Sequence, residues 1–139
     1  MNRLVNYRPW SLDAAALLLR LFFGGLFIYH GWSKIEGYND ILPKFPDLIG
    51  IGAHLSFNLV IFAEFVCGIL VTIGLLTRLA VIPILITMCV VYFKALATAA
   101  FPMRELPLVF LLLTLVIMLL GPGRISIDRL LTREKRYHR

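Results

Sequence analysis

The chain has 139 residues, of which 60% are hydrophobic, and its mean hydropathy is +0.86. An ordinary soluble domain is about 45–50% apolar, so the composition argues against a soluble globular protein and favours one embedded in a lipid bilayer. The net charge of +6 does not indicate nucleic-acid binding, because most Lys and Arg residues lie between apolar segments rather than in one basic patch.

Four apolar segments follow one another along the chain, each close to the ~20 residues that a helix needs to cross a bilayer. We expect spans at about 12–31, 54–75, 79–99 and 103–120, an outer loop at 32–53 and a basic tail at 124–139. Ser11 is expected to cap the first span, with Asp13 in its first turn. Because this segment contains Arg20 and lacks a small-residue cleavage site, we expect it to stay attached rather than act as a signal peptide. Residues 1–139 are predicted to form a single membrane domain.

The loop at 32–53 is long for so small a protein. It is interrupted by Pro43, Pro46, Gly50 and Gly52, yet it carries enough apolar side chains to lie on the bilayer or over the end of a bundle. Long loops of this kind are often functional. The sequence leaves open whether the loop is a lid over a cavity.

The basic residues outside the spans predict the orientation of the chain. Four spans place both termini on one side of the membrane, and apart from the deep Arg20 and Lys94 that side holds Arg3, Arg8, Arg78, Arg124, Arg129, Arg133, Lys135, Arg136 and Arg139. The other side holds only Lys34, Lys44 and Arg104. By the positive-inside rule, both termini lie in the cytoplasm. The predicted fold is therefore an all-α integral membrane four-helix bundle with up-down-up-down topology and both termini cytoplasmic.

Two charged residues fall deep within the predicted spans. At 1.5 Å per helical residue, Arg20 lies about 12 Å from the inner start of the first span and Glu64 about 15 Å from the outer start of the second. Both positions fall near the middle of a hydrocarbon core about 30 Å thick. A single charge there is costly, so we predict that Arg20 and Glu64 pair with each other. Such a pair either only fixes the helix register or takes part in function, and both readings stay open.

Four further polar side chains are expected nearer the outer surface, namely His30, Lys34, Lys94 and Glu105. On a helix that advances about 100° per residue, Arg20, His30 and Lys34 fall within an arc of roughly 80°. We therefore predict a polar pocket, open toward the outer face, formed by Arg20, His30, Lys34, Glu64, Lys94 and Glu105. Simpler readings also stay open: His30 is either an interfacial residue or a proton-transfer group, Lys34 extends to the interface, and Lys94 and Glu105 neutralise each other.

No familiar catalytic motif and no Cys/His metal spacing occurs in the sequence. No metal site is predicted. Cys67 and Cys89 lie inside apolar segments without CxxC spacing, and we expect buried, unreactive thiols. A bis-histidine haem is not favoured, because His30 and His54 both lie near the outer surface and His138 is in the tail.

Three blocks of the sequence resemble the DoxX family of small bacterial membrane proteins. They are Arg20 with His30-Gly31 and Lys34, then Glu64 with Gly68 and Gly74-Leu75-x-Thr77-Arg78, and then Glu105 with Gly121-Pro122-Gly123-Arg124-Ile-Ser126-Ile-Asp128. The resemblance implies a four-helix protein of the bacterial inner membrane that serves redox complexes linked to quinone, with partners such as superoxide dismutase or a sulfurtransferase. It implies no settled catalytic residues.

Two functional hypotheses follow. In the first, the protein is a subunit or accessory of a quinone-linked redox complex acting on thiosulfate or thiols or in oxidative stress, and the polar pocket handles a proton or an anionic substrate. In the second, it is a non-enzymatic membrane scaffold or assembly factor whose charge pairs are structural. A solute carrier is disfavoured because the inner half of the bundle offers few polar groups. Whether the chain is an enzyme is left open, and a partner subunit or self-association is expected at this length.

Overall fold

The computed structural model of the protein describes residues 11–137, all of whose regular elements are helical. Arg3, Arg8, His138 and Arg139, which entered the predictions above, lie outside the described residues.

Four helical segments are long and apolar enough to cross a membrane. They are α1 (Leu12–Glu36), the continuous run of α3 (Ala53–Ile61), the π-helical turn η2 (Phe62–Val66) and α4 (Cys67–Ile73), the run of α5 (Thr77–Val90) and the π-helical turn η3 (Val91–Ala95), and α6 (Phe101–Leu120). Three shorter helices complete the described chain: α2 (Tyr38–Ile41), the 3₁₀ turn η1 (Leu42–Lys44) and α7 (Ile127–Tyr137).

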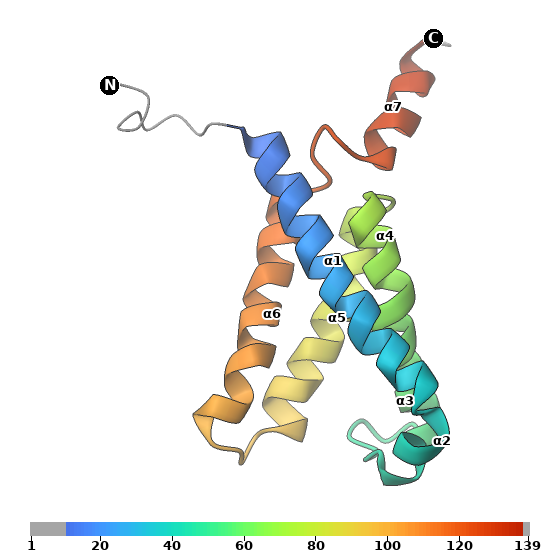
Figure 1. Cartoon of the computed structure of the whole chain (residues 1–139), viewed down its shortest axis with the longest axis vertical. Helices are drawn as coiled ribbons and strands as arrows, with labels where there is room; N and C mark the ends of the chain where they lie inside the picture. Colours follow the sequence, from blue (N-terminus) through green and yellow to red (C-terminus); the bar gives the residue numbers. More distant parts are fainter. Residues whose placement is uncertain (1–10, 138–139) are drawn as a thin grey trace.

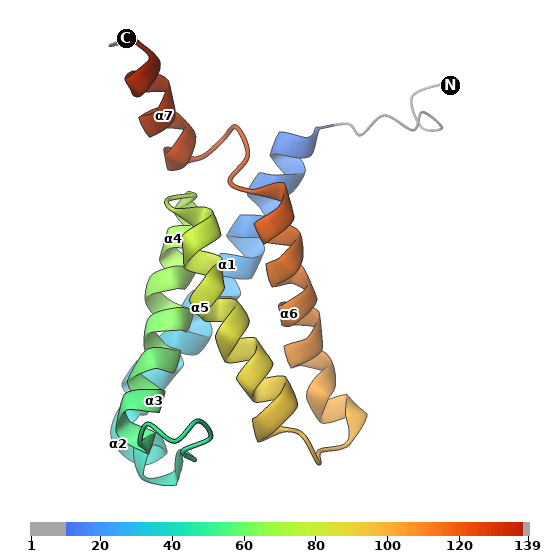
Figure 2. The same ribbon diagram turned by 180° about the vertical axis from the view of Figure 1, so that it is seen from behind.

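The four long segments alternate in direction, as the sequence predicts (Figures 1 and 2). One end of the bundle carries the start of α1, the turn between α4 and α5, and α7, and we name it the terminal end. The other end carries α2 and the loop that leads to α3, and we name it the loop end. In Figure 1, α1 crosses diagonally in front of the other spans. It packs most extensively against α4, whereas α5 packs mainly against α6.

The first helix is longer than predicted and carries Lys34 in its last turn. The prediction ended this span at Gly31, but the helix continues to Glu36, because residues 32–36 contain no helix-breaking residue and Gly31 is required for close packing. Its start is as predicted, since the Ser11 hydroxyl accepts a hydrogen bond from the Ala14 amide at 3.1 Å. The second span ends earlier than predicted, at Ile73, where Gly74 adopts a left-handed φ of +72°.

Aromatic side chains and glycines hold the centre of the bundle together. The rings of Phe27 and Phe110 have centroids 5.0 Å apart, and that of Phe23 lies 4.6 Å from Phe27. Gly31 allows α1 to touch the second span, because a Cβ at this position would lie 2.6 Å from the amide nitrogen of Phe65. Cys67 is buried in this core as predicted, whereas Cys89 is only half-buried.

Candidate functional site

A cavity of about 230 Å³ near the loop end contains three of the predicted site residues. It is lined by Phe27, His30, Lys34, Phe45, Val60, Glu64, Met88, Val91, Leu106, Pro107 and Phe110. We name it the loop-end cavity. Its wall is mostly apolar, and its polar groups come from α1 and from η2. A few polar groups converging in an apolar cavity are typical of a small-molecule site.

The central feature of this cavity is an ion pair between Lys34 and Glu64. The Lys34 Nζ atom donates to Glu64 Oε2 at 2.6 Å, and the two side chains are 26% and 7% exposed. Glu64 belongs to η2, the π-helical turn of the second span. π-helical turns widen the backbone locally and are frequent at functional sites. The pair brings two formal charges into the apolar part of the bundle, where a charge requires a partner.

His30 lies one helical turn before Lys34 on the same face of α1, and it lines the same cavity. Its ring packs edge-on against Phe110 on α6, with the centroids 6.2 Å apart. A histidine next to a lysine–glutamate pair places three groups that can exchange protons around one cavity. The arrangement is chemically suited to binding a polar group and to supplying or removing a proton.

The predicted pair between Arg20 and Glu64 is wrong. Arg20 Nη2 donates instead to the main-chain carbonyl of Ile125, and the side chain is 1% exposed. The register of α1 against the second span explains the error: Gly31 lies against Phe65, whereas Arg20 lies against Gly74. Glu64 is therefore level with the last turns of α1, and Arg20 is close to the terminal end rather than at the midplane.

Arg20 belongs to a second polar cluster at the terminal end, which we name the terminal-end tie and define by Arg20, Gly74, Thr77, Ile125 and Asp128. A Cβ at residue 74 would collide with the Arg20 guanidinium. The Asp128 carboxylate accepts hydrogen bonds from the Thr77 amide at 3.1 Å and the Thr77 hydroxyl at 3.3 Å. The tie connects α1, the start of α5 and the segment that follows α6, so its role in the fold is to hold the terminal end together.

Lys94 and Glu105 do not join the loop-end cavity or pair with each other. Lys94 Nζ donates to the carbonyl of Leu48 at 3.1 Å, and Glu105 is exposed. Between η3 and α6 it is Arg104 that makes contact, with its guanidinium 4.3 Å from the centre of the Tyr92 ring. The two ion pairs of the described residues are Lys34–Glu64 and Arg124–Asp13.

Sequence reasoning placed Asp128 only in a block that resembles the DoxX family, without predicting its capping role, and it missed the two π-helical turns. Asp128 stands in the first turn of α7, and an acidic residue at such a position is a signal for capping. That it caps α5 rather than its own helix depends on long-range packing. The π-helical turns at Phe62–Val66 and Val91–Ala95 leave no recognisable mark in the sequence.

The fold and the cavity define the class of this protein: a small integral membrane four-helix bundle with a partly buried ion pair near one end. Its family follows from comparison with known proteins, since residues 15–97 match the DoxX family. The chain therefore belongs to the DoxX family, as the resemblance indicates.

Three relatives are similar over most of their length. An uncharacterized membrane protein of Mycobacterium tuberculosis is 33% identical over 86% of this chain and 83% of its own. The inner membrane protein YqjF of Escherichia coli is 32% identical over 88% of this chain and 95% of its own. An uncharacterized protein of Haemophilus influenzae is 26% identical over 84% of this chain and 83% of its own. No solved structure matches the chain.

Proposed function

We propose that this chain is a bacterial inner-membrane subunit or accessory of a quinone-linked redox complex, and that the loop-end cavity binds the quinone head. The observation that carries the proposal is the Lys34–Glu64 ion pair, 2.6 Å long, beside His30 in a mostly apolar cavity. A quinone head is an uncharged ring with carbonyl oxygens, which need hydrogen-bond donors in an apolar surrounding. Lys34 and His30 are the donors that the cavity offers.

Each group has a distinct role in this proposal. Reduction of a quinone to a quinol takes up two electrons and two protons, and the electrons come from a partner subunit that oxidises thiosulfate or a thiol. Lys34 orients one carbonyl oxygen and His30 delivers one proton to it, while water at the loop end supplies the second proton to the other oxygen. Glu64 holds the Lys34 ammonium in place through their 2.6 Å hydrogen bond, which fixes the direction in which the ammonium can donate. Arg20, Lys94 and Glu105, which the sequence groups with these residues, have no part in this cavity.

The proposed orientation places the terminal end in the cytoplasm and the loop-end cavity toward the outer face. It is supported by the basic residues Arg78, Arg124 and Arg129, which stand at or beyond the terminal end of the spans. A reporter protein that works only in the cytoplasm should be active when it is fused after Arg139. Activity of a reporter that works only in the periplasm, fused at the same position, would contradict the orientation.

The redox role is tested by electron transfer in membrane vesicles from cells that lack their own copy and express this chain. Reduction of a short-chain quinone is followed with thiosulfate or a thiol as donor. Glu64→Gln and His30→Ala should each lower the rate by about 100-fold, the lower end of what a positioned proton-transfer group contributes. Arg124→Ala, which alters an exposed ion pair, serves as the matched control and should leave the rate unchanged. Unchanged rates in both cavity variants would refute the proposal.

A second candidate is a non-enzymatic membrane scaffold or assembly factor. It is favoured by the terminal-end tie, where Arg20 and Asp128 bond to the backbone of the protein itself rather than facing the loop-end cavity. In this case a partner protein should co-purify equally with the wild type and with Glu64→Gln, and neither should bind quinone. Loss of the partner in Glu64→Gln alone, with the fold intact, would contradict a purely structural role for the pair.

A further inference from the structure

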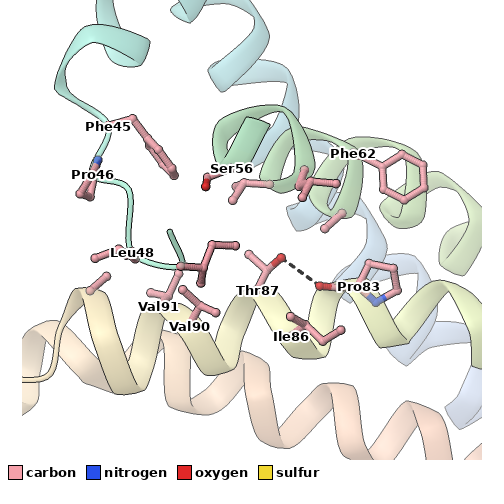
Figure 3. Close-up of a pocket in the computed structure, with 15 residues that line it drawn as sticks. Phe45, Pro46, Leu48, Ser56, Phe62, Pro83, Ile86, Thr87, Val90 and Val91 are labelled. Carbon is pink, nitrogen blue, oxygen red and sulfur yellow. Dashed lines mark hydrogen bonds between the residues drawn. The ribbon is translucent and has the colours of Figure 1, made fainter. Parts of the chain in front are cut away.

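A second and larger pocket of about 400 Å³ opens on the side of the bundle. Its walls are the second span, the α5–η3 segment and the loop after η1, shown in Figure 3 with the residues that line it. We name it the side pocket. Phe45, Val60 and Val91 line both this pocket and the loop-end cavity, so those side chains form a common wall. At its mouth Leu59, Phe62 and Ile86 are 47%, 46% and 59% exposed, and in a membrane this mouth faces lipid.

The side pocket holds one buried polar group without a partner, the hydroxyl of Ser56. This residue is 5% exposed, and its Oγ makes no hydrogen bond. Three threonines in the spans behave differently: Thr72, Thr87 and Thr114 each donate to the carbonyl four residues earlier, at 2.8, 2.9 and 2.6 Å. In Figure 3 the Ser56 oxygen points into the space beside Phe45. A buried hydroxyl without a partner is unfavourable, so this position is suited to a ligand that accepts a hydrogen bond.

The pocket extends through one half of the membrane, with Ser56 near its outer limit. Ser56 is three residues from the start of α3, or about 4.5 Å along the helix axis. Pro83, at the other extreme, is twelve residues from the end of η3, or about 18 Å. Half of a hydrocarbon core of about 30 Å is about 15 Å. The pocket therefore has the length of one lipid chain, and its polar atom lies at the depth where the chain meets the headgroup.

A positive charge stands at the same end of the pocket. Lys94 donates through Nζ to the carbonyl of Leu48, and both Leu48 and the neighbouring Ala95 line the pocket. The Lys94 side chain is exposed and has no carboxylate partner among residues 11–132, whose side chains the structure describes. A cation at this depth attracts the phosphate of a lipid headgroup, and a quinone has no phosphate.

We propose that the side pocket binds one acyl chain of a glycerophospholipid from the leaflet at the loop end. The ester carbonyl of that chain accepts a hydrogen bond from Ser56, and the phosphate lies by Lys94. The apolar walls take the chain toward the middle of the bilayer. This site is separate from the loop-end cavity and does not depend on the redox role.

The test is photo-crosslinking of the full-length protein reconstituted in phosphatidylethanolamine vesicles that contain phosphatidylglycerol with a diazirine in its acyl chain. Crosslinked residues are mapped by mass spectrometry. We expect crosslinks to concentrate on Val60, Ala63 and Val90, which line the pocket from two facing spans. Crosslinks spread evenly over exposed apolar residues such as Leu112 and Leu119 on α6 would overturn the proposal.

Three variants sharpen the result. Ile86→Trp places a large ring at the pocket mouth and should lower crosslinking in the pocket about tenfold. Ile82→Trp is its matched control, because Ile82 is also an exposed isoleucine on α5, one turn away, and does not line the pocket. Ser56→Ala should lower crosslinking about 2- to 10-fold, which corresponds to one hydrogen bond. Circular dichroism of each variant checks the fold.

Equal crosslinking in Ile86→Trp and Ile82→Trp would overturn the pocket as a binding site. A long-chain quinone added in excess should leave the crosslinks unchanged. Displacement by the quinone would overturn the phospholipid as occupant, whatever the outcome of the electron-transfer assay.

Discussion

Removal of the Asp128 carboxylate should destabilise the terminal end of the bundle. Asp128 accepts three hydrogen bonds, from the Leu76 amide at 2.7 Å, the Thr77 amide at 3.1 Å and the Thr77 hydroxyl at 3.3 Å. These amides belong to the start of α5, where no helical carbonyl is available to them. Leu76 also adopts a left-handed φ of 49°, which is unusual for leucine and depends on such support.

The size of the effect follows from the burial of the two residues. Loss of a helix cap costs about 0.5–2 kcal/mol, and a buried donor left unpaired costs about 1–3 kcal/mol. Leu76 is 53% exposed and its amide can bond to water instead, whereas Thr77 is fully buried. The two costs concern the same amides and do not add, so Asp128→Ala should lower the free energy of unfolding by about 2 kcal/mol, or about 30-fold in the equilibrium constant.

The assay is reversible unfolding with sodium dodecyl sulfate in mixed micelles, followed by far-ultraviolet circular dichroism. Asp40→Ala is the matched control, because Asp40 is an exposed aspartate whose carboxylate accepts no hydrogen bond within residues 11–132, where side chains are described. It should unfold like the wild type. Thr77→Val, which keeps the amide and removes only the hydroxyl, should give a smaller loss than Asp128→Ala. Identical unfolding of Asp128→Ala and Asp40→Ala would refute the capping role.

Two further predictions concern packing and surface charge. Gly31→Val should destabilise the bundle by about 1–3 kcal/mol in the same assay, because a Cβ there would press on Phe65. Gly25→Val meets open space and should have a much smaller effect. Equal effects of the two substitutions would contradict the close approach of the two spans. Arg124→Ala should change the free energy of unfolding by less than about 1 kcal/mol, because its ion pair with Asp13 is 3.6 Å long and largely exposed. A loss comparable to that of Asp128→Ala would contradict so small a contribution of this pair to stability.

The spans, their alternation and the membrane class could be predicted because they depend on long runs of apolar residues, which the sequence displays directly. Which residue pairs with a buried charge depends on the register of one helix against its neighbour, and the sequence indicates that register only indirectly. The prediction ended the first span five residues too early and so placed Lys34 in the loop. In the structure α1 continues to Glu36, and Lys34 lies in the bundle next to Glu64. Glycines at 31 and 74 carry this register information, because each marks a place where one chain touches another.

Three of the six residues of the predicted pocket line one cavity in the structure. His30, Lys34 and Glu64 share a level in the bundle and line one cavity, whereas Arg20 lies nearer the other end, in the terminal-end tie. Helix periodicity correctly placed His30 and Lys34 on one face of α1. The π-helical turn around Glu64 could not be foreseen, since local sequence does not determine where a turn widens. That residues 1–139 form one domain and that the pocket is functional both stay predictions.

The central claim is that the Lys34–Glu64–His30 cavity binds a quinone head, and calorimetric titration of the purified protein with a short-chain quinone tests it most directly. The wild type and Arg124→Ala should bind with the same affinity. Glu64→Gln should bind about 10- to 100-fold more weakly, because the hydrogen bond from a fixed ammonium is lost. Absence of binding to the wild type, or equal affinity for Glu64→Gln in a correctly folded protein, would contradict the claim.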